Sequence, residues 1–387
     1  MARRLSAALL VCMVLTLLAG CGGSKGDIII GHFAPMSGDT AAWGQMEIKG
    51  IQLAEEEINK AGGVLGRKIK IVSYDDRGDK VEAVNVVKKL ISEKAVAIVG
   101  EQTSSASMAA GPIVAAAKVP AIGTASTNPR VTVGDDGKLN PWYFRVCFID
   151  PFQGRALAFY SVKKLNKTKA AILYDIGEDY AVGLADSFKK NFAELGGTVV
   201  ATETFKGGEE DFRAQLTRIK QFNPEIIVIP IYYKEAALAM KQARELGIDA
   251  VFMGGDGLES PTLTDLAGPA AEGCIFTSHY SSQDTTPTVR KFIENYKAKF
   301  NGEEPDVNTA LGYDGVYIVV DAIKRAGKVD SQAIRDAMEQ TKGLECVTGT
   351  ITMDPATHNP LDKSIVVNVV KDGKIQFLER LDLAKVQ

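Results

Sequence analysis

Short apolar runs alternate with amphipathic helical stretches along this chain from residue 27 onward. The runs at residues 28–32, 69–74 and 95–99 have the length and the β-branched composition of buried strands. Residues 42–61 carry apolar side chains three and four positions apart, which indicates one buried face of a helix. Because strands and helices alternate, the pattern predicts an α/β fold built on a parallel sheet with crossover helices.

A second series with the same pattern follows the first. Helices are expected at residues 152–165 and 180–195, and strands at residues 170–174, 225–232 and 251–254. Two series of similar size predict two Rossmann-like lobes, each a parallel sheet flanked by helices.

The last third of the chain is expected to return to the first lobe and then to close the second. Helical patterns at residues 287–300, 309–325 and 331–341 would pack on the first lobe. An Asp372-Gly373 pair between two apolar runs predicts a β-hairpin in the second lobe.

These elements divide the chain into two lobes joined by a multi-strand hinge. The predicted first lobe comprises residues 27–145 and 279–348, and the second comprises residues 146–278 and 349–387. Several parallel crossings between two lobes favour a hinge motion that opens and closes the cleft between them.

Small hydroxyl residues follow two of the predicted first-lobe strands. Ser104 and Ser105 stand where the next helix needs an N-cap, and Thr124 and Thr127 follow the next strand. A helix N-terminus carries unpaired N–H groups and the positive end of the helix dipole, so it is suited to a carboxylate or a phosphate. Neighbouring strands would bring both clusters to the carboxyl edge of the sheet, where open α/β sheets bind ligands. The alternative is that these hydroxyls only cap helices and fill turns.

The N-terminus has the features of an export signal. Two arginines precede an apolar run at residues 5–18, and the sequence LAGC ends at Cys21. The run is short for a membrane span, and a cysteine after small residues is typical of a lipoprotein signal. We therefore expect removal of residues 1–20, lipidation of Cys21 and a tether at residues 21–26, which would anchor an exported protein at the cell envelope. The alternative is an uncleaved signal anchor.

Composition excludes several other classes of protein. The chain has 387 residues, 45% of them hydrophobic and 24% charged, with a net charge of −3, whereas a nucleic-acid binder needs a basic face. Cys147, Cys274 and Cys346 are odd in number and widely spaced, so they predict no disulfide framework, although export permits one pair. With only three histidines and no close ligand spacing, we expect no metal and no cofactor.

No common catalytic motif occurs in the chain. It lacks G-x-S-x-G, H-E-x-x-H, a P-loop and G-x-G-x-x-G. Ser104 also has no histidine in the neighbouring sequence that would activate it. These absences favour a binding protein over an enzyme.

Six short segments, in order and at matching spacing, resemble the periplasmic leucine/isoleucine/valine-binding protein family. They read APMSGDTAAWG (34–44), INKAGG (58–63), YDD (74–76), VGEQTSS (99–105), GEEDF (208–212) and FMGGDG (252–257). The resemblance covers the whole mature length. It implies a type I periplasmic-binding fold and the role of substrate receptor in a branched-chain amino-acid ABC importer. Such a receptor is expected to be a monomer that docks on membrane permease and ATPase subunits.

The resemblance also implies which residues bind the amino acid. Hydroxyls and backbone amides at Ser104 and Thr127 would hold its carboxylate. The Ala125 carbonyl and the Asp256 carboxylate would hold its ammonium group, because neither charge can be buried unpaired. Glycines on both sides of Asp256 would let the backbone approach the ligand closely.

Further positions match the aromatic residues and the side-chain pocket of the family. These are Tyr180 and Tyr232 in the second lobe, and Trp43, Gln102, Thr103 and Tyr313 around the ligand side chain. Each has a simpler interpretation: Asp256 as an ordinary turn residue, the two tyrosines as packing residues, and Trp43 as a residue that pins a loop.

The chain also departs from the family pattern. Some members carry glutamate at the position of Asp256, and Gly78 and Thr103 replace a disulfide of some members. The expected ligand is therefore an amino acid, with an aliphatic or branched side chain as the leading candidate. An amide, a urea or an aromatic acid is the alternative, and a sensing module for a separate signalling partner is another.

Overall fold

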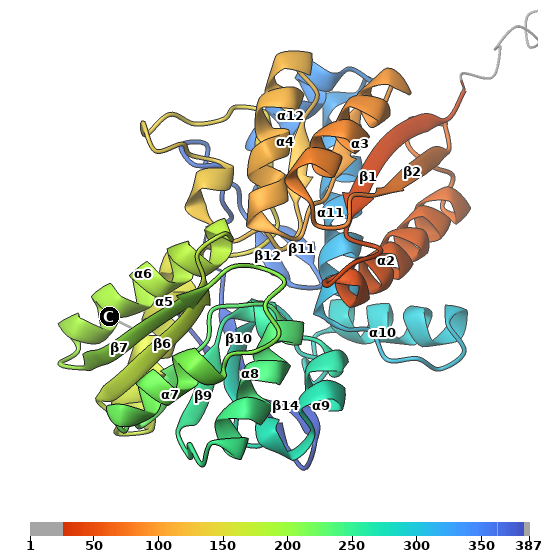
Figure 1. The fold of residues 1–387 in the computed structure, drawn as a ribbon. Coiled ribbons are helices and arrows are strands. Elements are labelled where there is room, and N and C mark those ends of the chain that lie inside the picture. Colours follow the sequence, from red (N-terminus) through yellow and green to blue (C-terminus); the bar gives the residue numbers. More distant parts are fainter. Residues whose placement is uncertain (1–25, 362, 383–387) are drawn as a thin grey trace, which may run out of the picture.

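Two large sheets, one in each lobe, form the framework of the fold (Figure 1), as seen in a computed structural model that describes residues 26–361 and 363–382. Each sheet is mainly parallel and is flanked by helices, so the α/β fold with two Rossmann-like lobes is confirmed. The expected signal peptide, Cys21 and all but the last residue of the expected tether lie outside the described residues. Within the described residues, no helix combines the length and apolar character that a membrane span requires.

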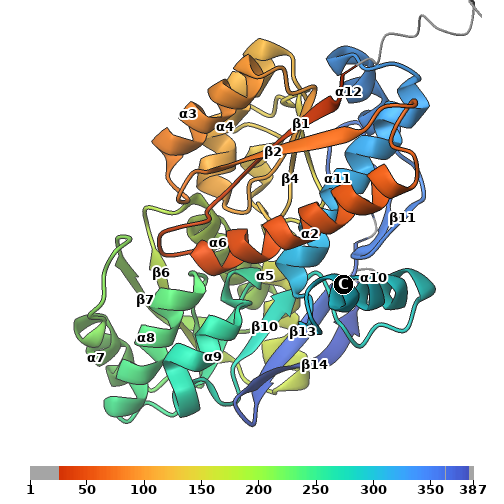
Figure 2. The same ribbon diagram turned by 90° about the vertical axis from the view of Figure 1, so that its right-hand side faces the viewer.

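The first-lobe sheet has the strand order β2-β1-β3-β4-β5, and all neighbours pair in parallel. Its strands are β1 (Ile28–Ala34), β2 (Ile69–Asp75), β3 (Ala97–Val99), β4 (Ala121–Gly123) and β5 (Tyr143–Arg145). Its helices are α2 (Ala41–Lys60), α3 (Lys80–Ser92), α4 (Ser104–Ala117), α10 (Pro287–Lys299), α11 (Val307–Ala326) and α12 (Ser331–Glu339), with a 3-10 turn at Pro129–Val131. The three C-terminal helices pack on this lobe (Figure 2), where the sequence analysis expected them.

The second-lobe sheet has the strand order β14-β13-β10-β9-β8-β6-β7. Its strands are β6 (Lys169–Asp175), β7 (Thr198–Phe205), β8 (Ile226–Val228), β9 (Val251–Gly254), β10 (Ile275–Ser278), β13 (Ile365–Lys371) and β14 (Lys374–Leu381). Its helices are α5 (Asp150–Phe159), which continues as a π-helical turn (Tyr160–Lys164), α6 (Asp179–Glu194), α7 (Arg213–Gln221), α8 (Tyr233–Glu245) and α9 (Pro261–Ala267), with 3-10 turns at Asp256–Leu258 and Gly268–Ala271.

The predicted C-terminal hairpin is present as β13 and β14. These strands pair antiparallel, with Lys371 opposite Lys374, and the two turn residues Asp372 and Gly373 have φ angles of 53° and 69°. A two-residue turn with positive φ at both positions matches the twist of the flanking strands, which explains the Asp-Gly pair.

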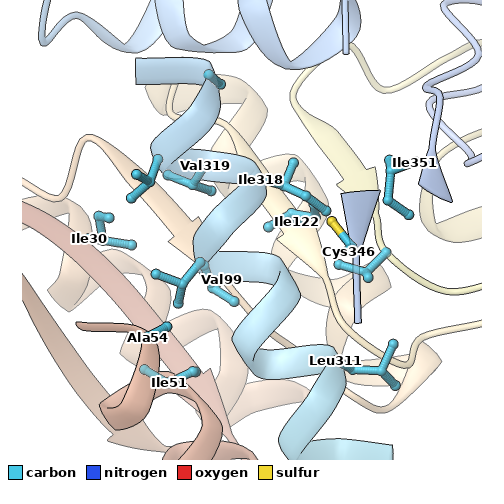
Figure 3. Packing of buried hydrophobic residues seen from close by; sticks show 14 of the residues in the cluster. Ile30, Ile51, Ala54, Val99, Ile122, Leu311, Ile318, Val319, Cys346 and Ile351 are labelled. Carbon is cyan, nitrogen blue, oxygen red and sulfur yellow. The ribbon is translucent and has the colours of Figure 1, made fainter. Parts of the chain in front are cut away.

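The first-lobe core gathers around α11, as Figure 3 shows. Val99 of β3 and Ile122 of β4 are fully buried in one cluster with Ile318 of α11. Burying each such aliphatic side chain stabilises the fold by about 1.5–3 kcal/mol. A helix from the last third of the chain therefore completes the core of the N-terminal sheet.

The last crossing between the lobes lies later in the chain than the sequence analysis placed it. β12 (Gly349–Ile351) pairs antiparallel with β11 (Leu344–Cys346), and Ile351 and Met353 are buried in the first-lobe core. Residues 349–353 thus pack on the first lobe, and the chain reaches the second-lobe sheet only at β13. A short apolar run indicates that the segment is buried, but it does not indicate in which of the two cores the segment packs.

Candidate functional site

The two sheets bring their carboxyl ends together where the lobes meet. In the first sheet the strand order reverses between β1 and β3, and in the second it reverses between β6 and β8. Crevices outside the carboxyl ends of strands at such reversals are where open α/β sheets bind ligands. β3 and β4 pair in parallel, with Val99 opposite Ile122, so the two hydroxyl clusters do lie at one edge of the sheet.

A small cavity between the lobes is lined by residues from both of them. The first lobe contributes Trp43, Gln102, Ser104, Ala125, Val307, Asn308 and Leu311, and the second lobe and the hinge contribute Tyr180, Tyr232, Asp256, Gly257 and His279. Seven of the ten residues proposed from the sequence are therefore brought together. The cavity measures about 20 Å³ and adjoins a larger chamber of about 370 Å³, which shares the two tyrosines with it.

The first-lobe wall is the N-terminus of α4. Ser104 is its first residue and is 1% exposed, and its hydroxyl oxygen accepts a hydrogen bond from the Asn128 N–H at 3.1 Å. The Ser104 hydroxyl hydrogen and the free N–H groups of the first helical turn remain as donors for an anion. The N-cap residue is Thr103 rather than a serine, and its hydroxyl donates to Glu101 at 2.6 Å instead of accepting from the helix.

Thr127 lies behind this wall. It is fully buried, its carbonyl accepts from the Asp150 N–H at 3.0 Å, and it does not line the cavity, whereas Ala125 does. Burial raises the pKa of Asp150 to about 8, and the neighbouring Thr127 hydroxyl partly opposes that shift. Thr127 thus contacts the start of α5 in the second lobe through its carbonyl rather than lining the cavity.

Burial raises the pKa of three acids beneath the first-lobe wall and favours their protonated form. Burial raises the pKa of Glu47 to about 8 and that of Asp76 to about 7, and it raises the pKa of Glu101 well above its usual range. Protonated carboxyls do not repel an anion at the N-terminus of α4. The acidic residues under the site are therefore compatible with a ligand carboxylate.

The second-lobe wall presents Asp256 on a polar network. Gln153 of α5 donates its amide N–H to Asp256 Oδ1 at 2.9 Å and accepts from the Asp256 backbone N–H at 2.9 Å. The Thr277 hydroxyl also donates to Gln153 Oε1, at 2.6 Å, and His279 Nε2 lies 2.8 Å from Asp256 Oδ2. Each carboxylate oxygen has one partner and keeps a lone pair for a ligand.

Aromatic rings close the cavity. Tyr232 stacks on Tyr180 with ring centroids 5.4 Å apart, and Trp43 meets Tyr232 edge-on at 5.0 Å. The Tyr180 hydroxyl oxygen accepts from the Gly257 N–H at 3.1 Å, which ties this ring to the Asp256 loop. The Tyr232 hydroxyl is buried with no partner within the described residues, so it remains as a polar group for a ligand.

Two further residues from the sequence analysis lie elsewhere. Thr103 lines the larger chamber rather than the cavity. Tyr313 is not brought to the cleft: its hydroxyl donates to Glu57 at 2.5 Å, and its ring packs on Phe292 and Tyr317. Helical position alone does not reveal which face of α11 points to the ligand, and Leu311 takes that place instead.

Several residues that sequence reasoning missed belong to the site, among them Gly257, Val307 and Leu311 on the cavity wall. His279 and Asn308 line the cavity, and Gln153 supports Asp256 from behind. His279 directly follows β10, so its place at the carboxyl end of a strand was a signal that could have found it. Gln153 and Asn308 had no such signal.

No group of metal-ligating side chains capable of holding an ion occurs among residues 26–361 and 363–382. In the same part of the chain, Cys147, Cys274 and Cys346 are buried free thiols. The site within these residues is therefore one of hydroxyls, amides, an imidazole, one largely buried carboxylate and aromatic rings.

Comparison with known proteins finds relatives over nearly the whole chain. The family model "Periplasmic binding protein" matches residues 27–374. The Leu/Ile/Val-binding protein homolog 2 of Brucella abortus is 31% identical over 376 residues, which cover 96% of this chain and 98% of that protein.

Solved structures agree with this match. A leucine-binding protein from Thermotoga maritima is 40% identical, with a TM-score of 0.87 and coverage of 92% of this chain and 99% of that chain. The branched-chain amino acid transporter substrate-binding protein LivJ from Streptococcus pneumoniae, solved with isoleucine, is 36% identical, with a TM-score of 0.85 and coverage of 92% and 99%. An ABC transporter solute-binding protein from R. palustris, solved with benzoate, is 25% identical, with a TM-score of 0.81 and coverage of 92% and 96%.

Proposed function

The chain belongs to the periplasmic binding protein family, and from this premise we propose that it captures a branched-chain amino acid for an ABC importer. It is thus an exported binding protein and not an enzyme. One observation supports the proposed ligand most strongly: two different kinds of polar group line the same cavity from opposite lobes. The α4 N-terminus with Ser104 faces the Asp256 carboxylate, and together they match the two charges of a zwitterion.

The apolar part of the cavity supports an aliphatic side chain. Trp43, Val307 and Leu311 offer hydrocarbon or aromatic surface beside the polar groups. Relatives at 31% and 40% identity are named for Leu/Ile/Val or leucine binding, and one at 36% identity was solved with isoleucine. Both observations favour leucine, isoleucine or valine over a charged amino acid.

Ligand capture requires the lobes to move. A cavity of about 20 Å³ has room for roughly one water molecule, far less than an amino acid needs, so the ligand enters when the lobes are apart. A ligand that contacts Ser104 in one lobe and Asp256 in the other stabilises the closed form by its differential affinity for that form. The closed protein would then dock on the permease and ATPase subunits.

The N-terminal sequence supports a lipid anchor for this receptor. The apolar run followed by LAGC predicts cleavage before Cys21 and attachment of lipid there, with the receptor acting as a monomer at the envelope. Mass spectrometry of the mature protein would test this, since a Cys21→Ser variant should be neither lipidated nor held at the membrane.

An aromatic acid is the competing ligand class, because a relative at 25% identity was solved with benzoate. A lone anion would place its carboxylate near Ser104 but would leave Asp256 without a cation. The Asp256 carboxylate therefore favours a ligand that also carries an ammonium group.

Isothermal calorimetry on the delipidated protein tests the proposal. Wild type should bind leucine or isoleucine tightly, and Asp256→Ala should abolish tight binding while the fold is kept, because it removes the counter-charge of the ammonium. A thermal-shift screen with amino acids, amides, ureas and aromatic acids identifies the class, since a bound ligand raises the melting temperature. Unchanged affinity in Asp256→Ala would contradict the assigned role, and a shift with benzoate alone would contradict the ligand class.

A further inference from the structure

We propose that His279 is a positioning residue for the ligand ammonium: it holds the Asp256 carboxylate toward the cavity, and its protonation weakens amino-acid binding. This inference rests on the proposed function above. According to this inference, His279, which lies in the hinge segment directly after β10, takes part in recognising the amino group of the ligand.

Two contacts fix the His279 ring in place. Its Nε2 lies 2.8 Å from Asp256 Oδ2, and its face stacks on Phe148 with ring centroids 3.7 Å apart and an interplanar angle of 27°. The residue is 3% exposed and lines the cavity. Since Gln153 bonds the other carboxylate oxygen, His279 and Gln153 together determine where the charge of Asp256 points.

The surroundings of the ring select its neutral form. A contact between Nε2 and a carboxylate requires the ring hydrogen on Nε2, which donates to Asp256. Nδ1 is buried and has no hydrogen-bond partner within the described residues. A second proton on Nδ1 would be a buried donor without an acceptor, which costs free energy, whereas a bare Nδ1 costs less.

Protonation of His279 would also compete directly with the ligand. Imidazolium beside Asp256 would neutralise the carboxylate that the ammonium needs, so ligand binding and protonation disfavour each other. Asp256 and Lys363, in the segment before β13, act electrostatically on the ring. Asp150 at the start of α5 and Glu259 are the titratable groups that interact with its partner Asp256. Burial lowers the pKa of His279, Lys363 lowers it further, and Asp256 partly opposes both.

The sign of the pH dependence follows from these groups. The net pKa of His279 lies below its usual value of 6.5, so the ring is neutral at neutral pH and this contribution to affinity is constant there. As the pH falls through the lowered pKa, imidazolium forms and affinity for the amino acid declines. A ligand that binds only by its carboxylate would lack this decline.

The test uses isoleucine as the probe and calorimetry from pH 7.5 down to the lowest pH at which the unliganded protein stays folded. His279→Gln keeps an amide N–H near the position of Nε2 but cannot titrate, so it should stay within about three-fold of wild type at pH 7.5 and lose less affinity than wild type at the acid end of the series. His279→Leu removes the donor and should weaken binding about ten-fold at pH 7.5. Thermal unfolding of the unliganded variants shows whether each remains folded.

A matched control is His358, a second buried histidine. It also stacks on a phenylalanine, Phe144, at 3.9 Å and lies 3.1 Å from a carboxylate, Glu339, but it sits in the first lobe away from the cavity. Its φ of 54° suits asparagine, so His358→Asn should keep the fold and the wild-type affinity and pH profile.

The outcomes separate the two proposals. If wild type binds isoleucine but His279→Gln shows the same acid loss and His279→Leu the same affinity, the role of His279 is wrong and the proposed function stands. If folded wild type binds no amino acid, the proposed function is wrong, and the inference about His279 is wrong with it.

Discussion

The indole N–H of Trp43 in the first lobe donates to the backbone carbonyl of Glu259 in the second lobe at 2.9 Å. The same ring meets Tyr232 and Tyr233 edge-on, and the neighbouring Ala42 N–H donates to the Tyr233 hydroxyl at 3.2 Å. Trp43 therefore forms a wall of the cavity and joins the two lobes at once.

Trp43→Phe should weaken amino-acid binding about five-fold, because it keeps a ring at the wall but removes one hydrogen bond worth about 1 kcal/mol between the lobes. Calorimetry with leucine measures the change. Trp142→Phe is the matched control, since Trp142 is buried in the first lobe among residues such as Ile98 and Val114. It should lower stability without changing affinity. Equal affinity of the Trp43 variant and wild type would argue against the interlobe role.

Asp179 at the start of α6 is a second link between the lobes. Its carboxylate accepts from the Ser105 hydroxyl at 3.0 Å and from Arg130 at 3.0 Å, and its carbonyl accepts from the Asn128 amide at 2.7 Å. Asp179→Asn removes the charge, and because partly exposed ion pairs each contribute about 1 kcal/mol or less, we expect up to five-fold weaker binding.

The loss should appear mainly as faster ligand dissociation in stopped-flow fluorescence, and it should shrink at high salt, where ion pairs are screened. Asp186→Asn on the same helix is the control, because Asp186 pairs with Lys189 within the second lobe. A salt-independent effect, or equal effects of both variants, would contradict a link through charge.

Gly255 leaves no room for a side chain beside Tyr180. A Cβ there would lie 2.4 Å from the Tyr180 hydroxyl oxygen and 2.5 Å from Leu184 Cδ2. Gly255→Ala should displace the ring or the Asp256 loop, weaken ligand binding at least ten-fold and cost about 1–3 kcal/mol of unfolding free energy. Calorimetry and urea denaturation measure the two effects.

Gly111→Ala provides the comparison for Gly255→Ala. A Cβ at position 111 would have the Asn140 side-chain amide nitrogen as its nearest neighbour, at 3.1 Å. Alanine also favours the helical conformation over glycine by about 1 kcal/mol. Affinity should stay at the wild-type value in this variant. Tight binding by Gly255→Ala would show that the loop adapts.

Glu47 should make the protein less stable as the pH rises. Its folded-state pKa is raised to about 8 by burial, so the folded state keeps a proton that the unfolded chain loses near pH 4.5. This contribution to stability is therefore present below pH 4.5 and is lost between about pH 4.5 and 8, by at most about 1.4 kcal/mol per pH unit.

Glu47→Gln removes that titration, so its stability relative to wild type should be greater at pH 8 than at pH 5. Urea denaturation at the two pH values measures the difference. Glu194→Gln, at an exposed position of α6, should leave the pH dependence unchanged. A Glu47 variant that parallels wild type at both pH values would show that Glu47 is ionised in the folded protein.

Much of the architecture was predictable because buried parallel strands are short apolar runs and the crossover helices between them carry a regular apolar face. Most strands of both sheets and the hairpin at Asp372-Gly373 follow from such local patterns, whereas β5 was not predicted as a strand. Several site residues could also be predicted from the sequence, since Ser104, Tyr232 and Asp256 each lie in the segment that follows a strand. Their assigned roles remain proposals.

Contacts between segments that lie far apart in the sequence could not be predicted from sequence patterns. Residues 349–353 have an apolar pattern that fits either core, and only packing against the first lobe decides between them. Tyr313 and Leu311 lie two positions apart on one helix, yet only Leu311 points to the cavity, because the orientation of α11 depends on the sheet beneath it.

The amino-acid sequence by itself determined the alternation of strands and helices, the two lobes and the chemistry that follows each strand end, because these depend on neighbours along the chain. The tertiary structure alone decided that His279 meets Asp256, that Trp43 of one lobe bonds Glu259 of the other, and that burial raises the pKa of acids such as Glu101 and Glu47. Those relationships depend on which surfaces pack together and exclude water, and no local pattern records that.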